Sequence, residues 1–205
     1  MTCHGRGFLA VSLGVALTSC AQLAPRQPAA GALVVEARED PSQRFIGLIG
    51  PKAQHSPRFL DIPETNFYCL RSFVDRRTGE TAHQLYVTDS YFGAERVWNA
   101  ARDSAGAPLA FVPIGRDEIS CNPGCSYAEE FAANLPESAL RESPDGLAVT
   151  FLSASGVEKT IFVSSERITA QLAAIDARRH PAPSAAARAQ PIAAGGSATH
   201  QSGYP

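Results

Sequence analysis

The feature that most constrains the fold is a series of short apolar runs separated by turn residues. The clearest pair is 66–74 (NFYCLRSFV) and 81–88 (TAHQLYVT), which flank the polar segment 75–80. Gly79 in that segment can adopt the positive φ that hairpin turns need. The pattern therefore predicts a β-hairpin.

Other runs repeat this arrangement along the chain. A second hairpin is predicted over 146–152 and 158–163, which flank the turn segment 153–157. Further strands are predicted at 32–37, at 44–49 and at 109–115, whereas 94–101 is compatible with either a helix or a strand. Pro113 lies inside the 109–115 run, which places that strand at a sheet edge or a bulge.

The segment 126–135 (SYAEEFAANL) carries conflicting signals. Ser126 and Glu129 have the spacing of a helix capping box, and Ala and Glu favour helix. Pro136, however, is typical of the first turn of a separate short helix over 136–140. A strand that runs into this helix is simpler than two helices that abut, so we interpret 126–135 as a strand.

A final helix is predicted over 166–177, with Ser165 as its cap. Ile168, Leu172 and Ile175 lie on one face at helical spacing, so this face should pack on a sheet. Seven or eight short strands followed by one helix indicate a mainly β fold. We expect an antiparallel sandwich or partial barrel with a C-terminal helix, and two-layer α+β is the alternative.

The two ends of the chain differ from this central region in composition. Segment 20–31 contains two prolines and few large apolar side chains, which is typical of a spacer. Segment 180–205 is rich in Ala, Pro and Gly and contains Ile192 as its one large aliphatic residue, so its composition predicts disorder. The sequence thus predicts one β-rich domain over 32–179.

The first residues read as an export signal. Arg6 precedes ten uncharged residues, 8–17, a stretch too short to cross a membrane, which takes about 20 residues. The run that follows, Leu17-Thr18-Ser19-Cys20, resembles the lipobox of bacterial lipoproteins. The resemblance covers the signal peptide, 1–19, and the cysteine after it. It implies cleavage before Cys20 and a lipid on the Cys20 thiol.

The resemblance also carries an expected location. Two or three acyl chains on Cys20 would anchor the protein stably, because stable anchoring needs more than one chain. The residue after the cysteine is Ala21 and not Asp, which in the enteric sorting rule favours the outer membrane over the inner one. We therefore expect a lipid-anchored protein of the bacterial cell envelope, on the periplasmic face of the outer membrane.

The charge balance argues against one class of partner. Loss of Arg6 with the signal peptide lowers the Lys and Arg count from 18 to 17, against 20 Asp and Glu, for a formal net charge of −3. A charge this close to zero gives no reason to expect nucleic acid as a partner. The expected partners are the membrane, through the lipid, and another envelope protein.

Three cysteines remain for the mature domain: Cys69, Cys121 and Cys125. An odd number in an oxidising compartment cannot pair completely within one chain. Cys121 and Cys125 flank a Pro-Gly turn, which favours a small loop-closing disulfide, and a bridge from Cys69 to either of them is the alternative.

A metal or redox site is a weaker interpretation of the same cysteines. Thiolates of Cys121 and Cys125 with His83 would suit Cu(I) or zinc, and the spacing resembles that of copper-delivery proteins with a thioredoxin fold. The βαβ pattern of that fold is missing around the motif. We expect no cofactor, and we expect His83 to be either a cross-strand surface histidine or a satisfied core histidine.

The remaining polar candidates also favour structural roles. Glu129 and Glu130 would face opposite sides of a strand, so they cannot act as a catalytic pair, and a solvated sheet edge is expected. Arg76 and Arg77 at the tip of the first hairpin, together with Arg71, form a small basic patch that reads as a solvated turn.

No nucleophile, zinc-protease, phosphate-loop or dinucleotide motif occurs in the chain. This weakens the case for an enzyme without excluding one. The leading hypothesis is a non-enzymatic envelope lipoprotein whose β-rich domain binds another envelope component. The alternatives are a metal-binding or thiol-redox protein that uses Cys121 and Cys125, and an envelope hydrolase with an unrecognised site.

Overall fold

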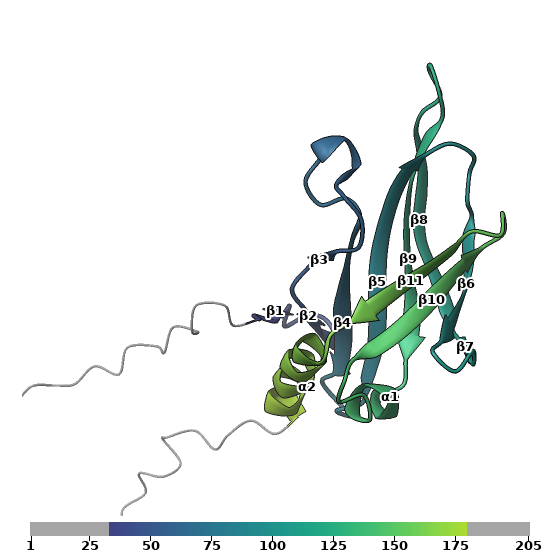
Figure 1. Ribbon diagram of the computed structural model, residues 1–205. Helices are drawn as coiled ribbons and strands as arrows, with labels where there is room; N and C mark the ends of the chain where they lie inside the picture. Colours follow the sequence, from purple (N-terminus) through teal and green to yellow (C-terminus); the bar gives the residue numbers. More distant parts are fainter. Residues whose placement is uncertain (1–32, 180–205) are drawn as a thin grey trace, which may run out of the picture. The chain divides into compact units, whose positions relative to one another are not determined.

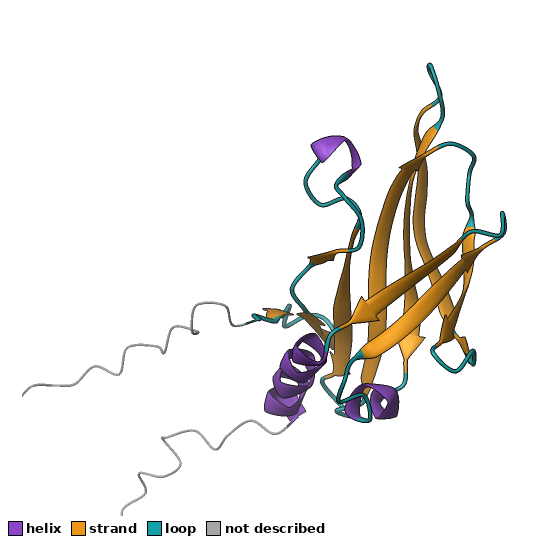
Figure 2. Ribbon diagram, in the orientation of Figure 1, coloured by secondary structure: helices purple, strands orange, loops and turns teal. Residues whose placement is uncertain are grey.

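The structure is a computed structural model that describes residues 33–179. Within this range, antiparallel strands form two sheets whose apolar faces pack against each other, and a long helix ends the domain (Figures 1 and 2). The expected mainly β fold with a C-terminal helix is confirmed. The predicted signal peptide, lipobox, spacer and tail lie outside the described residues.

The larger sheet, sheet A, has the strand order β1-β2-β4-β5-β9-β8, with the two-residue β3 paired to β4. The short 3-10 helix η1 (Phe59–Asp61) lies in the loop between β3 and β4. The strands are β1 (Glu36–Arg38), β2 (Phe45–Ile49), β3 (Ala53–Gln54), β4 (Phe67–Asp75), β5 (Thr81–Phe92), β8 (Phe111–Ser120) and β9 (Ser126–Leu135).

The smaller sheet, sheet B, has the order β11-β10-β6-β7. Its strands are β6 (Trp98–Asp103), β7 (Pro108–Leu109), β10 (Leu147–Ser153) and β11 (Glu158–Val163). Two helices complete the domain, α1 (Glu137–Arg141) after β9 and α2 (Ser165–Arg179) after β11. Figure 1 shows both helices at the same end of the sheets, with α2 beside β4.

The two predicted hairpins are present with the expected turns. β4 and β5 pair from Tyr68 with Val87 to Val74 with Thr81, and Gly79 in their turn has a φ of 75°. β10 and β11 pair around the 153–157 turn in the same way. Both pairs follow the period-2 pattern in which alternate side chains enter the core.

The two segments whose sequence is compatible with both helix and strand, 126–135 and 94–101, contribute strands. β9 runs between β5 and β8, so its backbone is paired on both sides, and Phe131, Ala133 and Leu135 enter the core. These long-range pairings override the local helix signals, and Pro136 precedes α1 as expected. The open 94–101 segment enters β6 at Trp98.

The sequence predicted seven or eight strands, and the described residues form eleven. Three of these have only two or three residues, β1, β3 and β7, too few to give a pattern. The predicted strand at 32–37 is displaced to Glu36–Arg38. Pro113 does lie in an edge strand, β8, where the pairing register with β9 shifts between Pro113 and Gly115.

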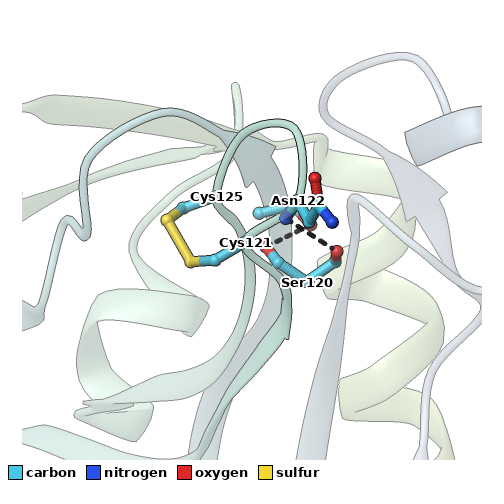
Figure 3. The surroundings of a disulfide bond; sticks show 5 residues. Ser120, Cys121, Asn122 and Cys125 are labelled. Atoms are coloured by element: carbon cyan, nitrogen blue, oxygen red, sulfur yellow. Dashed lines mark hydrogen bonds between the residues drawn. A yellow bond between two sulfur atoms is a disulfide. The ribbon is translucent and has the colours of Figure 1, made fainter.

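A disulfide closes the tip of the β8–β9 hairpin. Cys121 and Cys125 are bonded to each other, as the sequence favoured (Figure 3). The alternative bridge from Cys69 is wrong, because Cys69 is a free, buried residue of β4.

The core lies between the two sheets and under α2. Phe131 of sheet A meets Phe151 of sheet B edge to face, with 4.9 Å between ring centroids, and Trp98 packs on Phe131 at 5.3 Å. Ile168 and Ile175 of α2 are buried as predicted, and Leu172 packs against the core beside them.

A row of polar groups joins the helices to sheet A. Gln171 of α2 donates to Ser72 Oγ (2.9 Å), which in turn lies 3.0 Å from His83 Nδ1. His83 Nε2 lies 3.3 Å from a Glu137 carboxylate oxygen, and Arg179 donates two hydrogen bonds to the same carboxylate. His83 is therefore a satisfied core histidine, as expected.

This row gives the free energy of unfolding a pH dependence with two windows. Burial lowers the pKa of His83 below 6.5, so the unfolded chain binds a proton first and stability falls as the pH drops below about 6.5. Hydrogen bonds from Arg179 and Arg141 lower the pKa of Glu137 to about 2 from 4.5, so its contribution is lost as the pH falls below about 4.5.

Urea unfolding of the full chain at a series of pH values checks this. We expect His83→Gln to reduce the fall in stability between about pH 7 and pH 5, and Glu137→Gln to reduce the fall below about pH 4.5. Part of the fall in stability between about pH 7 and pH 5 should remain in His83→Gln, because burial also lowers the pKa of His55. An unchanged slope in both variants would contradict the assignment.

Candidate binding groove and the buried polar cluster that frames it

The strand pattern itself places charged groups inside the domain. On β5, Asp89 is in phase with Leu85 and Val87, which are core residues, and on β9, Glu129 is in phase with Phe131. Both carboxylates therefore point between the sheets, where Asp89 is 2% exposed and Glu129 4% exposed. Two buried carboxylates require hydrogen-bond or ion-pair partners.

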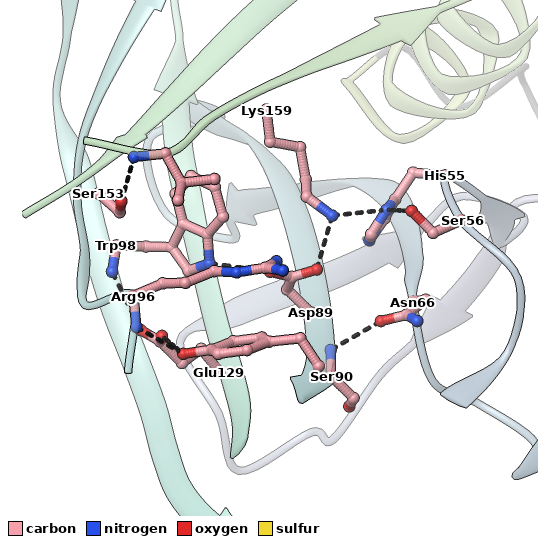
Figure 4. A network of polar contacts seen from close by, with 12 residues as sticks. His55, Ser56, Asn66, Asp89, Ser90, Arg96, Trp98, Glu129, Ser153 and Lys159 are labelled. Atoms are coloured by element: carbon pink, nitrogen blue, oxygen red, sulfur yellow. Dashed lines mark hydrogen bonds and ion pairs between the residues drawn. The ribbon is translucent and has the colours of Figure 1, made fainter. Parts of the chain in front are cut away.

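Asp89 is held by three donors (Figure 4). Lys159 of β11 donates to one carboxylate oxygen at 2.6 Å. Arg96 and the indole Nε1 of Trp98 donate to the other at 2.8 and 3.0 Å. Because Lys159 and Trp98 belong to sheet B, this carboxylate ties the two sheets together.

Glu129 organises the start of β6. The backbone N–H groups of Val97 and Trp98 both donate to its carboxylate, at 3.1 and 3.0 Å, and so does the Tyr91 hydroxyl. Val97 has a φ of 57°, a conformation that a β-branched residue rarely adopts. This strain is held in place by the hydrogen bonds, because the turn at Val97 is what directs two successive N–H groups at one carboxylate.

His55 closes the cluster on the far side of Lys159. Its Nε2–H donates to the Thr88 carbonyl at 2.8 Å, which leaves Nδ1 to accept from Lys159 at 3.2 Å and to contact Ser56 Oγ at 3.1 Å. Burial is the main cause that lowers the pKa of His55, and the neighbouring Lys159 charge acts in the same direction. His55 is therefore neutral in the folded protein at neutral pH.

The cluster is built to hold the sheets rather than to react. The negative charges of Asp89 and Glu129 are balanced by the positive charges of Arg96 and Lys159. Burial and the hydrogen bond to Glu129 raise the pKa of Tyr91, so its hydroxyl stays protonated and donates. Of the cluster, Glu129 and Trp98 line a surface groove, and Asp89 and Lys159 do not line that groove.

A groove of about 700 Å³ opens directly beside the cluster, where the sheets part between β6 and β8. We call it the side groove. Its floor is the aromatic core, with Trp98, Phe111 and Phe131, and Ile114 lines it while 44% exposed. Glu129, which fixes Trp98, lies at its wall.

Both walls of the side groove are sheet edges. β8 ends sheet A, so its outer edge has no strand beside it within 33–179. β7 pairs only with Ala101 and Arg102, which leaves the 98–100 part of β6 open on that side in the described domain. An ion pair between Arg116 and Glu95, 3.3 Å apart, links the two walls beyond Trp98.

The metal constellation considered from the sequence is not assembled. His83 pairs with Leu135 at one end of β9, whereas the disulfide adjoins Ser126 at the other end, about 30 Å away at ~3.3 Å per residue. Burial raises the pKa of the Cys69 thiol to about 11. The described residues contain no group of three or more potential metal ligands.

The predicted basic patch does not form either. Arg76 and Arg77 lie in the exposed turn, but Arg71 lies four residues before the end of β4 and stacks on the Tyr86 ring, 4.0 Å from its centroid. The solvated edge predicted for the two glutamates is wrong for Glu129, which is buried; Glu130 is exposed as predicted, but on a strand that is paired on both sides.

Sequence reasoning missed most of the polar cluster, including Asp89, Arg96, Trp98 and Lys159. A signal was available for the carboxylates, because each lies in phase with core residues of its own strand. Lys159 carried no such signal, since its partner is distant in sequence. Lys159 and Asp89, for example, are 70 positions apart.

Comparison with family models, with curated proteins and with solved structures finds no match for this chain. Among the described residues, no helix is both long and apolar enough to cross a membrane. The candidate site therefore has to be interpreted from its own geometry.

The two adjacent glutamates provide a matched test of the cluster. Glu129→Ala leaves three donors without an acceptor, so we expect a loss of about 3 kcal/mol in the free energy of unfolding. Trp98 is the single tryptophan, so its emission should shift to longer wavelength in this variant. Glu130→Ala, which removes an exposed contact with Tyr86, should cost less than about 1 kcal/mol and leave the emission unchanged. Equal effects in urea unfolding and fluorescence would refute the role of Glu129.

Proposed function

We propose that this chain is a lipid-anchored envelope protein that binds an extended segment of another envelope protein in the side groove, without catalysis. The observation that carries the binding part is the pair of open sheet edges above an aromatic floor. Extended peptides bind such edges through their main chain, and pockets beside the edge select their side chains.

The geometry favours the β6 wall for main-chain pairing. β7 pairs only with Ala101 and Arg102, so a bound segment would continue the row of β7 along Asn99 and Ala100, because the Trp98 N–H already donates to Glu129. On the β8 wall, Pro113 lacks an N–H and the register shift at Gly115 breaks the ladder, which opposes long edge-to-edge pairing of two copies. The bound segment is therefore short, and its apolar side chains rest on Trp98 and Phe111.

The anchoring part of the proposal depends on the lipobox resemblance at 17–20. A lipid on Cys20 would hold the domain near one membrane surface and so raise its effective concentration towards other envelope proteins. Binding in a groove then needs little intrinsic affinity. No observation on the described residues favours the metal-binding, redox or hydrolase alternatives, and we do not propose them.

Metabolic labelling with a palmitate analogue tests the anchor. We expect labelled wild-type protein in the membrane fraction and no label on Cys20→Ala. Cys69→Ala is the matched control and should keep the label, because that thiol is buried in the fold. Label that persists on Cys20→Ala would contradict the anchor.

Site-specific photocrosslinking in intact cells tests the groove. A photoreactive residue at Ile114, in the groove, should give one reproducible adduct that maps to a single short segment of its partner. Phe162 on β11 is the control, because it is also exposed and apolar, at 54%, but lies outside the groove. Identical adducts from both positions, or none from Ile114, would overturn the proposed binding site.

A further inference from the structure

A second groove crosses the face of sheet A that points away from sheet B. It consists of two adjoining hollows, of about 260 and about 740 Å³, that share Arg38, Ile49 and Arg71. We call it the outer trough. Leu70 and Val74 of β4 enter the core, so the alternate residues Arg71 and Phe73 face the trough. It is thus separate from the inter-sheet core.

The Arg71 side chain is fixed in position, but not all of its N–H groups have a hydrogen-bond partner. One guanidinium nitrogen donates to the Gln84 side chain at 3.0 Å, and the group stacks on the Tyr86 ring, 4.0 Å from its centroid, with the Phe73 centroid 5.9 Å away. Its Nε is buried and has no hydrogen-bond partner among the described residues. Stacking holds the guanidinium flat and fixes the direction of its outer N–H groups, an arrangement that suits an oxyanion.

Arg38 supplies a second cation on the same face. It lies opposite Gly47 of β2, which in turn lies opposite Phe73 of β4, so only a glycine separates Arg38 from the β4 side of the trough. Within residues 33–179, neither Arg38 nor Arg71 forms an ion pair. Their charges are thus not neutralised by a carboxylate of the described domain.

The acidic residues at the rim of the trough already have cationic or hydroxyl partners. Glu64 pairs with Lys52, Glu39 pairs with Arg178, and Glu130 accepts from the Tyr86 hydroxyl. Asp40 accepts from Ser42. Their charges remain near the trough, however, so a polyanion such as a phosphate-rich surface would be repelled. A single negative charge between Arg38 and Arg71 is compatible with this distribution of charges.

The apolar lining indicates what carries that group. Phe45 lines the larger hollow while 46% exposed, and Gly47 leaves its floor open beside Phe73. We propose that the outer trough binds the C-terminal carboxylate of an extended peptide with apolar side chains, with Arg38 and Arg71 as the carboxylate ligands. This site lies on a different face from the side groove and does not depend on the proposed function.

Fluorescence anisotropy with the full chain in detergent tests the proposal. The probe is a labelled Gly-Ala-Phe-Leu-Ala peptide with a free carboxylate, and the same peptide with a C-terminal amide is its control. We expect the free acid to bind at least about tenfold more tightly than the amide, because the amide loses the charged hydrogen bonds. Equal affinities would overturn the proposal.

Variants assign the effect to the two arginines. Arg38→Gln and Arg71→Gln should each weaken binding of the free acid about tenfold and leave the amide unchanged. Arg38 is exposed, so its substitution keeps the test valid even where loss of Arg71 disturbs the fold. Arg102→Gln, on sheet B, is the control and should bind the acid like wild type. Free-acid binding that survives Arg38→Gln would refute the site, and displacement of the peptide by equimolar decanoate would refute the peptide as ligand.

Discussion

The hydrogen bonds that converge on the Glu129 carboxylate are the contact on which the rest of the domain depends. They recruit the backbone of Val97 and Trp98, and so fix where β6 begins relative to sheet A. Once β6 begins there, the Trp98 ring lies on Phe131 and its indole N–H reaches Asp89. The aromatic floor of the side groove is a direct result.

Buried charges cost desolvation energy, and an apolar replacement of the same shape can be as stable. What the cluster adds is one defined position of the two sheets relative to each other. An apolar contact between two sheets tolerates sliding, whereas the hydrogen bonds of Asp89 to Lys159 and Trp98 are satisfied in only one register. The sheets can then part beside β6 and β8 without loss of their relative position, which is the condition for a stable open groove.

Much of the fold could be predicted from local pattern, and the site could not. The two long hairpins, the strand at 126–135 and the apolar face of the last helix followed from alternation, turn residues and Pro136, all of which act over a few residues. Glu129 was assigned to a solvated edge because adjacent glutamates resemble a surface pair when the partner sheet is unknown. The grooves depend on strand order and on edges left open, and neither property is encoded within a single strand.

Both proposed sites use sheet A, one at its β8 edge and one on its outer face, and the side groove presupposes that Glu129 fixes the start of β6 and so the register of the two sheets. Amide hydrogen exchange at Val97 and Trp98 measures that directly. We predict that both amides exchange only through global unfolding, as we also expect of the β9 amides, because they are bonded to a buried carboxylate. Exchange at Val97 and Trp98 as fast as in the exposed 104–107 turn would contradict the account.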